Sequence, residues 1–119
     1  MALLLSRQSI DRTSEIRAIE GLGYAYEGLG LSTVAVDYLE QRLKLAREYN
    51  NTPQILEALR TLAAYFRRNG DFINTENYYQ QAIAVAELIG DQQTQKIVQR
   101  QLEDLRLREA IKVEALRRR

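Results

Sequence analysis

The fold is decided by a nine-residue stretch that occurs twice: LGYAYEGLG at residues 22–30 and LAAYFRRNG at residues 62–70. The copies lie 40 residues apart, and sliding the sequence along itself by this distance keeps both glycines in register. Between the two complete repeats, the identical positions are Ala18/Ala58, Leu22/Leu62, Gly30/Gly70, Tyr38/Tyr78, Gln41/Gln81 and Ala46/Ala86. Identities spread over the whole period indicate an internal repeat.

Each repeat predicts a pair of helices. Apolar residues recur at spacings of three and four on both sides of the central glycine, which is the period of an amphipathic helix. Gly30 and Gly70 suit the left-handed position just past a helix end. Asn50-Asn51 and Gly90-Asp91 predict the turns between repeats. The residues expected to cap the following helices are Ser32, Thr52 and Asp71.

The repeat also predicts the domain organisation of a single domain, residues 1–119. The expected segments are the end of a preceding helix at 1–11, repeat 1 at 14–51, repeat 2 at 53–91, and a lone third-repeat or capping helix at 93–116. No stretch alternates long enough to make a strand, and short loops force consecutive helices to pack antiparallel. We therefore expect an all-α fold of antiparallel helix pairs, expressed as a segment or the end of a longer array.

Composition narrows the function. The chain has no Cys and no His, which removes thiol nucleophiles, disulfides, imidazole bases and most zinc, haem and iron–sulfur ligation. The acidic residues are spread without a pocket-forming pattern, so we expect no enzyme, no cofactor and no metal. Seventeen Lys+Arg against sixteen Asp+Glu is too balanced to indicate nucleic acid or a membrane surface. The short apolar start is neither a signal peptide nor a membrane span, and a cytoplasmic location is expected.

Two motifs carry a family resemblance. Leu22-Gly23-x-x-Tyr26 is followed by Gly30, and Leu62-Ala63-x-x-Phe66 is followed by Gly70-Asp71-Phe72. These motifs resemble the tetratricopeptide repeat (TPR). The 40-residue spacing exceeds the usual 34 and is similar to the long-helix type of kinesin light chains and Leu-Gly-Asn repeat adaptor proteins. The resemblance implies a right-handed α-α superhelix, or solenoid, that acts as a protein-binding scaffold or adaptor.

The sequence departs from the family pattern at two positions in the second helices. Arg42 stands where the next repeat has the small Ala82, and Thr75 stands where the first repeat has Ala35. Both departures cast doubt on how tightly these helices pack.

The resemblance also implies where a ligand lies, because the first helix of each pair lines a concave groove. Spacings of three and four place on that face Arg17, Glu20, Tyr24 and Glu27 in the first unit, Glu57, Arg60, Ala64, Arg67 and Arg68 in the second, and Arg100, Asp104 and Arg108 in the third. The candidate partner-binding residues are Arg17, Tyr24, Glu27, Arg60, Arg67, Arg68, Arg100 and Arg108. Arginines beside an aromatic ring favour an acidic peptide, through bidentate pairing and stacking. For any single arginine, a solvated helix face is the alternative.

The leading hypothesis is a protein–protein interaction module that binds a peptide or helix in the groove. The alternative is a homodimer or larger self-assembly through Leu3, Leu4 and Leu5 or through the last helix. RNA binding is suggested only by the arginines and is disfavoured by the balanced charge and the few groove aromatics. The Lys/Asn clamp of chaperone-binding family members is missing, because no Asn occupies the groove face.

Overall fold

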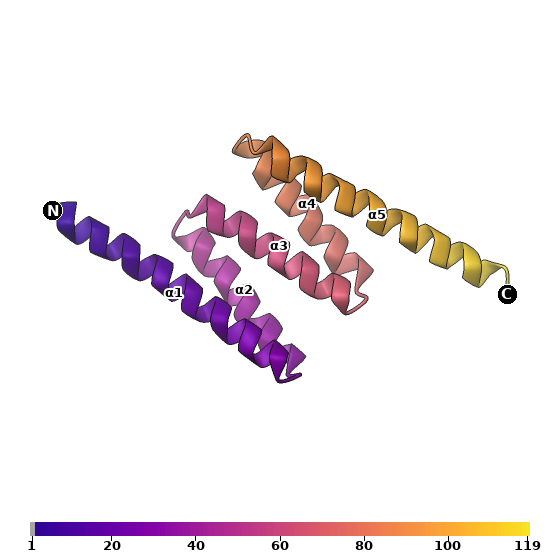
Figure 1. Ribbon diagram of the computed structural model, residues 1–119, viewed down its shortest axis with the longest axis horizontal. Helices are drawn as coiled ribbons and strands as arrows, with labels where there is room; N and C mark the ends of the chain where they lie inside the picture. The colour runs from indigo at the N-terminus through magenta and orange to yellow at the C-terminus, as the bar shows by residue number, and fades with distance from the viewer. Residues whose placement is uncertain (1) are drawn as a thin grey trace. The chain divides into compact units, whose positions relative to one another are not determined.

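The computed structural model describes the backbone of residues 2–119 and the side chains from Asp11 onward. This range is all-helical, without a strand, and consists of α1 (Ala2–Gly28), α2 (Ser32–Glu48), α3 (Thr52–Arg68), α4 (Phe72–Leu88) and α5 (Gln92–Arg117) (Figure 1). The chain divides into two units, one up to Ala58 and one from Leu59 onward, so that α3 contributes to both. In the first unit α1 packs on α2, and in the second α4 packs on α5. The predicted all-α pairing of consecutive helices is confirmed.

The helices follow a strict 20-residue period. Helices α2, α3 and α4 each have 17 residues. Each of the first four helices is followed, two residues after its end, by a residue with positive φ: Gly30 (77°), Asn50 (52°), Gly70 (73°) and Gly90 (73°). At the first turn, Gly30 N–H donates to the Glu27 carbonyl and Leu31 N–H to the Tyr26 carbonyl, both at 3.0 Å. The same two bonds recur at the other three turns. Paired bonds of this kind define the Schellman motif, and the predicted turns are confirmed.

The residue after each left-handed residue occupies the N-cap position of the next helix. The Asp71 and Asp91 carboxylates each accept a backbone N–H at 3.1 Å, from Asn74 and Thr94 respectively. The pKa of both carboxyls is lowered below the usual range. The larger cause is the side-chain hydrogen bond from Asn74 or Thr94, and the smaller cause is the backbone hydrogen bond from the same residue. The predicted cap at Asp71 is confirmed.

Two predicted caps were wrong by one position. Ser32 and Thr52 are the first helical residues, because the cap follows the left-handed residue at once. The cap position of α3 is Asn51, whose Oδ1 accepts the Gln54 N–H at 3.2 Å. The cap position of α2 is Leu31, whose side chain has no acceptor and makes no cap hydrogen bond.

Helix α1 corrects the predicted boundary between residues 1–11 and 14. It runs without a break from Ala2 to Gly28, because neither Gly nor Pro interrupts the chain before Gly21 and each polar residue costs only about 0.5 kcal/mol of helix propensity. Tyr49, which follows the last residue of α2, secures this helix by donating to the Glu15 carboxylate at 2.6 Å. That hydrogen bond raises the pKa of Tyr49, and the Arg12 guanidinium lies 4.9 Å from the centre of its ring.

The core of the first unit requires a close approach of α1 to α2. A Cβ on Gly23 would come within 2.8 Å of the Leu39 side chain, so the glycine is what lets the two helices meet. Ile16 and Leu39 are buried around this contact. Leu22, the first residue of the repeated motif, is 42% exposed, because the buried face is centred on Ile16 and Gly23.

Stacked aromatic rings occupy equivalent places in the two units. Tyr26 of α1 stacks on Tyr38 of α2 with ring centroids 5.4 Å apart. Phe66 of α3 stacks on Tyr78 of α4 at 5.7 Å. Each ring of the first pair lies 40 residues before its counterpart in the second pair, so the repeat in sequence is also a repeat in side-chain packing.

The second unit buries the facing sides of α4 and α5, through Tyr79, Ala82, Ala86, Val98 and Leu102. Thr75 is fully buried as well, because its hydroxyl donates to the Asp71 carbonyl at 2.6 Å, which removes the doubt raised by its polarity.

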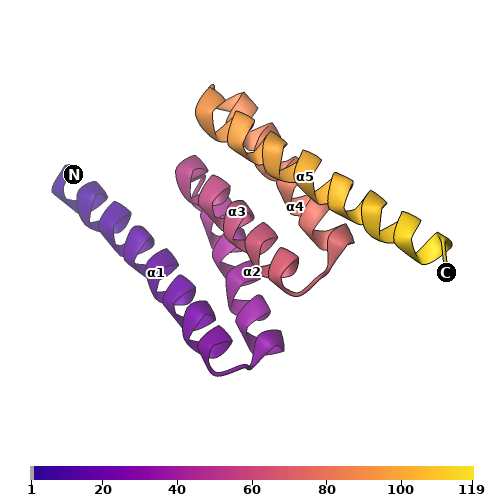
Figure 2. The ribbon, with the colours of Figure 1, turned by 45° about the vertical axis from the view of Figure 1, so that its right-hand side comes forward.

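Helix α5 is longer than α4, and its C-terminal part extends past the start of α4 (Figure 2). Near the start of α4, Glu76 pairs with Arg106 at 2.8 Å. Ile111 and Leu116 are both exposed: Ile111 lies on the side of α5 opposite the buried Leu102, and Leu116 lies beyond the part of α5 that α4 covers. Within the described residues, no helix is long and apolar enough to cross a membrane.

Candidate functional site

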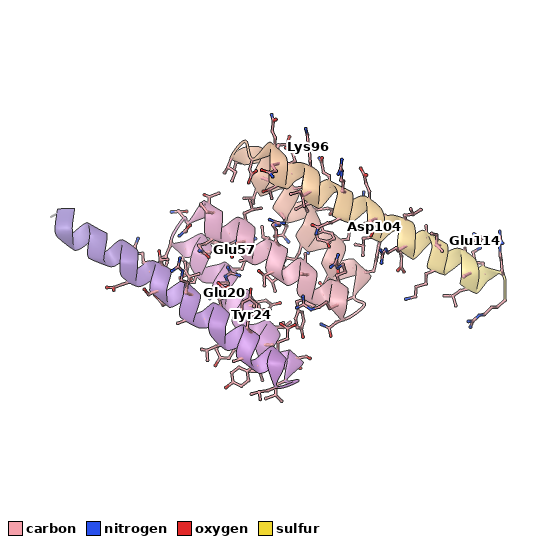
Figure 3. All side chains as sticks on the ribbon, in the orientation of Figure 1. Glu20, Tyr24, Glu57, Lys96, Asp104 and Glu114 are labelled. Atoms are coloured by element: carbon pink, nitrogen blue, oxygen red, sulfur yellow. The ribbon has the colours of Figure 1, made fainter. Side chains whose placement is uncertain are left out.

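The second unit holds an open hollow between the end of α3 and the middle of α5. Its volume is about 490 Å³, and its lining consists of Arg67, Gln101, Asp104, Leu105 and Arg108. The four α5 residues follow one another at spacings of three, one and three, which places them on one helix face. Figure 3 marks Asp104 at this place on α5. Two of the predicted partner-binding residues, Arg67 and Arg108, thus line the same hollow.

The charged residues that line this hollow differ in whether they already form an ion pair. Asp104 already pairs with Arg108, with the Arg108 Nε 2.9 Å from the carboxylate and both side chains largely in water. Arg67 is exposed and forms no ion pair with the residues that the structure describes. The hollow therefore presents one guanidinium whose charge is not balanced within the lining, beside a weak pair that competes little for an incoming anion.

The other predicted arginines of this unit lie outside the hollow. Arg68 and Arg100 are exposed, and Arg60 is half-buried. Arg60 lies near the cap of α5, where its charge adds to the hydrogen bonds that lower the pKa of Asp91. Arg60, Arg68 and Arg100, which the sequence also suggested as partner-binding residues, are not part of the lining of this hollow.

The first unit has a smaller hollow between α1 and the start of α3. Its volume is about 280 Å³, and its lining consists of Arg17, Glu20, Gly21, Tyr24, Gln54 and Glu57. Figure 3 marks Glu20 and Tyr24 on α1 and Glu57 on α3. Tyr24 is 45% exposed, so its ring is available beside Arg17, as the spacing predicted. Glu27 is half-buried and lines neither hollow.

A buried arginine joins the walls of this smaller hollow. Arg42 of α2 has no exposed side-chain surface and lies 3.0 Å from the Glu20 carboxylate and 3.6 Å from that of Glu57. It also donates to Gln54 Oε1 at 3.3 Å. All three partners line the hollow, so the buried Arg42 side chain connects α1 to the start of α3 beneath the surface of the hollow.

Sequence reasoning identified Arg42 as a departure but missed this role. The available signal was a cation on the buried stripe of a helix, at the position where the next repeat has the fully buried Ala82. A charge in such a place requires partners from neighbouring helices.

Two further candidates concern metal ligands and a self-assembly surface. Among the residues whose side chains the structure describes, no three acidic side chains gather as metal ligands. Leu3, Leu4 and Leu5, expected as one self-assembly surface, lie outside the residues whose side chains are described. No protein-family model matches the chain, and the search of curated proteins finds no match either.

Proposed function

We propose that this chain is a TPR-type module that binds an acidic segment of a partner protein without catalysing a reaction. A right-handed array, an adaptor or scaffold role and a cytoplasmic location belong to the same proposal. The observation that carries it is the hollow of the second unit, where the exposed Arg67 lies across from the Arg108–Asp104 pair.

The chemistry of this hollow favours a carboxylate. An arginine presents a planar fork of donors that matches a carboxylate in a bidentate geometry. The Arg108–Asp104 pair is separated by four residues on an exposed helix face, and such pairs contribute only about 0.3–0.5 kcal/mol. A ligand carboxylate at Arg67 therefore displaces water rather than a strong internal partner. Leu105 supplies an apolar wall for a side chain beside the acid.

Binding to the hollow is tested with two labelled peptides, one alternating Glu and Leu and one alternating Lys and Leu. Fluorescence anisotropy is expected to show the acidic peptide binding, with a dissociation constant of about micromolar as is usual for a modest interface. Arg67→Glu reverses the charge at the hollow and is expected to weaken this binding at least about tenfold, which corresponds to 1.4 kcal/mol.

Lys44→Glu is the matched control, because Lys44 is exposed on α2 and outside both hollows while the charge change is the same. Its binding should equal that of the unmodified chain. If both variants lose the same affinity for the acidic peptide, the loss reflects only the change in net charge. If the unmodified chain prefers the basic peptide, the proposal of an acidic partner is refuted.

A further inference from the structure

The outer face of the last part of α5 is an apolar strip exposed to water. Leu107 and Ile111 are 60% and 61% exposed. A shallow hollow of about 440 Å³ continues along this face and is lined by Ala110, Ile111, Glu114, Ala115 and Arg118. Exposed leucine and isoleucine next to small alanines form a surface on which another helix packs closely.

This face points away from the core of the second unit. Helical residues advance by 100° each, so Ile111 lies on the opposite side of α5 from the buried Leu102. Val113 and Leu116 are also exposed, but they fall on the inner side of the helix, with Leu102. The outer strip is therefore separate from the inner stripe that α4 covers.

The charges on the outer face have an ordered pattern around Ile111. The residues that share this face, in order, are Asp104, Leu107, Arg108, Ile111, Glu114, Ala115 and Arg118. Seven positions before Ile111 stands an acid and seven positions after it a base. Three positions before it stands a base and three positions after it an acid. The strip is thus complementary in charge to itself when one copy is reversed.

We propose that this strip is a self-association surface, on which α5 of a second copy lies antiparallel with the two-fold axis at Ile111. The pairs formed across the axis are Asp104 with Arg118, Arg108 with Glu114, Leu107 with Ala115, and Ile111 with its own counterpart. A parallel arrangement would set like charges against each other at all four charged positions. Complementary charges of this kind specify orientation and partner.

The charged residues of the strip form weak ion pairs within one copy, which pairs between two copies can replace. Within one copy, Arg108 pairs with Asp104 at 2.9 Å and Arg118 with Glu114 at 3.2 Å, and all four side chains are more than half exposed. Exposed pairs of this spacing are weak, so their charges remain available to a second copy. The contact is short, and small interfaces are weak, so we expect a dimer that dissociates at about 10–100 μM.

This surface is distinct from the peptide hollow, although Asp104 and Arg108 border both. The first test is sedimentation equilibrium of the full chain from micromolar to millimolar concentration. The mass is expected to rise from monomer to dimer. Ile111→Glu should keep the chain monomeric. Leu116→Glu is the control, because Leu116 is exposed to a similar extent, 56%, but lies on the inner side; it should leave the dimer intact.

The second test reverses all four charges together, as Asp104→Arg, Arg108→Glu, Glu114→Arg and Arg118→Glu. Both pairs within the helix and both pairs between copies are restored with opposite sign. The variant is therefore expected to dimerise with itself as the unmodified chain does, and not to form mixed dimers with it. Mixed dimers at the statistical ratio would refute the charge-defined pairing.

The third test fixes the register. The chain has no cysteine, so Ile111→Cys introduces a single thiol at the proposed axis. Mild oxidation is expected to link two copies through it, whereas Leu116→Cys should remain unlinked. A chain that stays monomeric at millimolar concentration, or a dimer that Leu116→Glu disrupts and Ile111→Glu does not, would overturn the proposal. Neither result bears on the binding of the acidic peptide to the Arg67 hollow.

Discussion

At the scale of single residues, Arg42 determines the spacing of the smaller hollow. Its burial takes a cation out of water, and Glu20 and Glu57 compensate for that cost. Arg42→Ala removes the cation, leaves a cavity and separates two carboxylates from their partner. We expect a loss of about 2 kcal/mol in the free energy of unfolding, less than for a fully buried pair because both glutamates retain contact with water. Urea denaturation measures this change.

The charge and the volume of Arg42 are separated by a second variant. Arg42→Met combined with Glu20→Gln fills the same space without buried charge, and we expect it to recover most of the lost stability. Lys44→Ala, on the exposed side of the same helix, should change the unfolding free energy by less than about 0.5 kcal/mol. If the double variant is as unstable as Arg42→Ala, the ion pairs of Arg42, and not the volume of its side chain, account for the lost stability.

At the scale of elements, the four caps are unequal. Asn51, Asp71 and Asp91 accept a backbone N–H of their helix, while Leu31 has no side-chain acceptor. Leu31→Asp supplies the missing acceptor, and we expect a gain of about 1 kcal/mol in the free energy of unfolding. Thermal and urea denaturation test this expectation. Leu29→Asp, two residues earlier in the same turn, introduces the same charge without a cap and should give no gain.

The helix ends show what the sequence could predict. Gly30, Gly70 and Gly90 located three of the four turns to within two residues, because few other residues tolerate positive φ. Asn50 located the fourth, since asparagine visits the same region more readily than other side chains do. The caps at Ser32 and Thr52 were misplaced because both hydroxyl residues are good caps by type. Their position depends on where the preceding helix stops, which propensity alone does not fix.

At the scale of the whole molecule, the titrating caps are confined to one unit. Asp71 and Asp91 cap helices of the second unit, whereas Leu31 and Asn51 occupy these positions in the first. Their pKa values are lower in the folded chain than the unfolded value of 3.8. The stability that they contribute is therefore complete above that pH and is lost as the pH falls through the lower, folded values. Asp71→Asn with Asp91→Asn keeps both caps but removes the titration.

This double variant is expected to lose less stability than the unmodified chain when the pH is lowered from about 5 to below the usual aspartate range. Urea denaturation at a series of pH values gives the comparison. Parallel curves for the two proteins would mean that other carboxylates account for all of the acid sensitivity.

The candidate site was less predictable than the fold. Of the residues that helical spacing suggested, Arg17, Tyr24, Arg67 and Arg108 line a hollow. Helical spacing also suggested Arg60 and Arg100, which line neither hollow. Helical spacing determines on which side of its helix a residue lies. How much of that side a neighbouring helix covers depends on packing between residues that are distant in the sequence.

The 20-residue period has a consequence for how such a chain changes in length. Asn50 and Gly90 are equivalent left-handed residues, and Asn51 and Asp91 are equivalent caps. A tandem duplication of the forty codons for residues 51–90 would join Gly90 to Asn51 and so reproduce a turn and cap of the kind already present. A duplication or deletion whose ends lie in these turns therefore adds or removes a helix pair without creating a new type of junction.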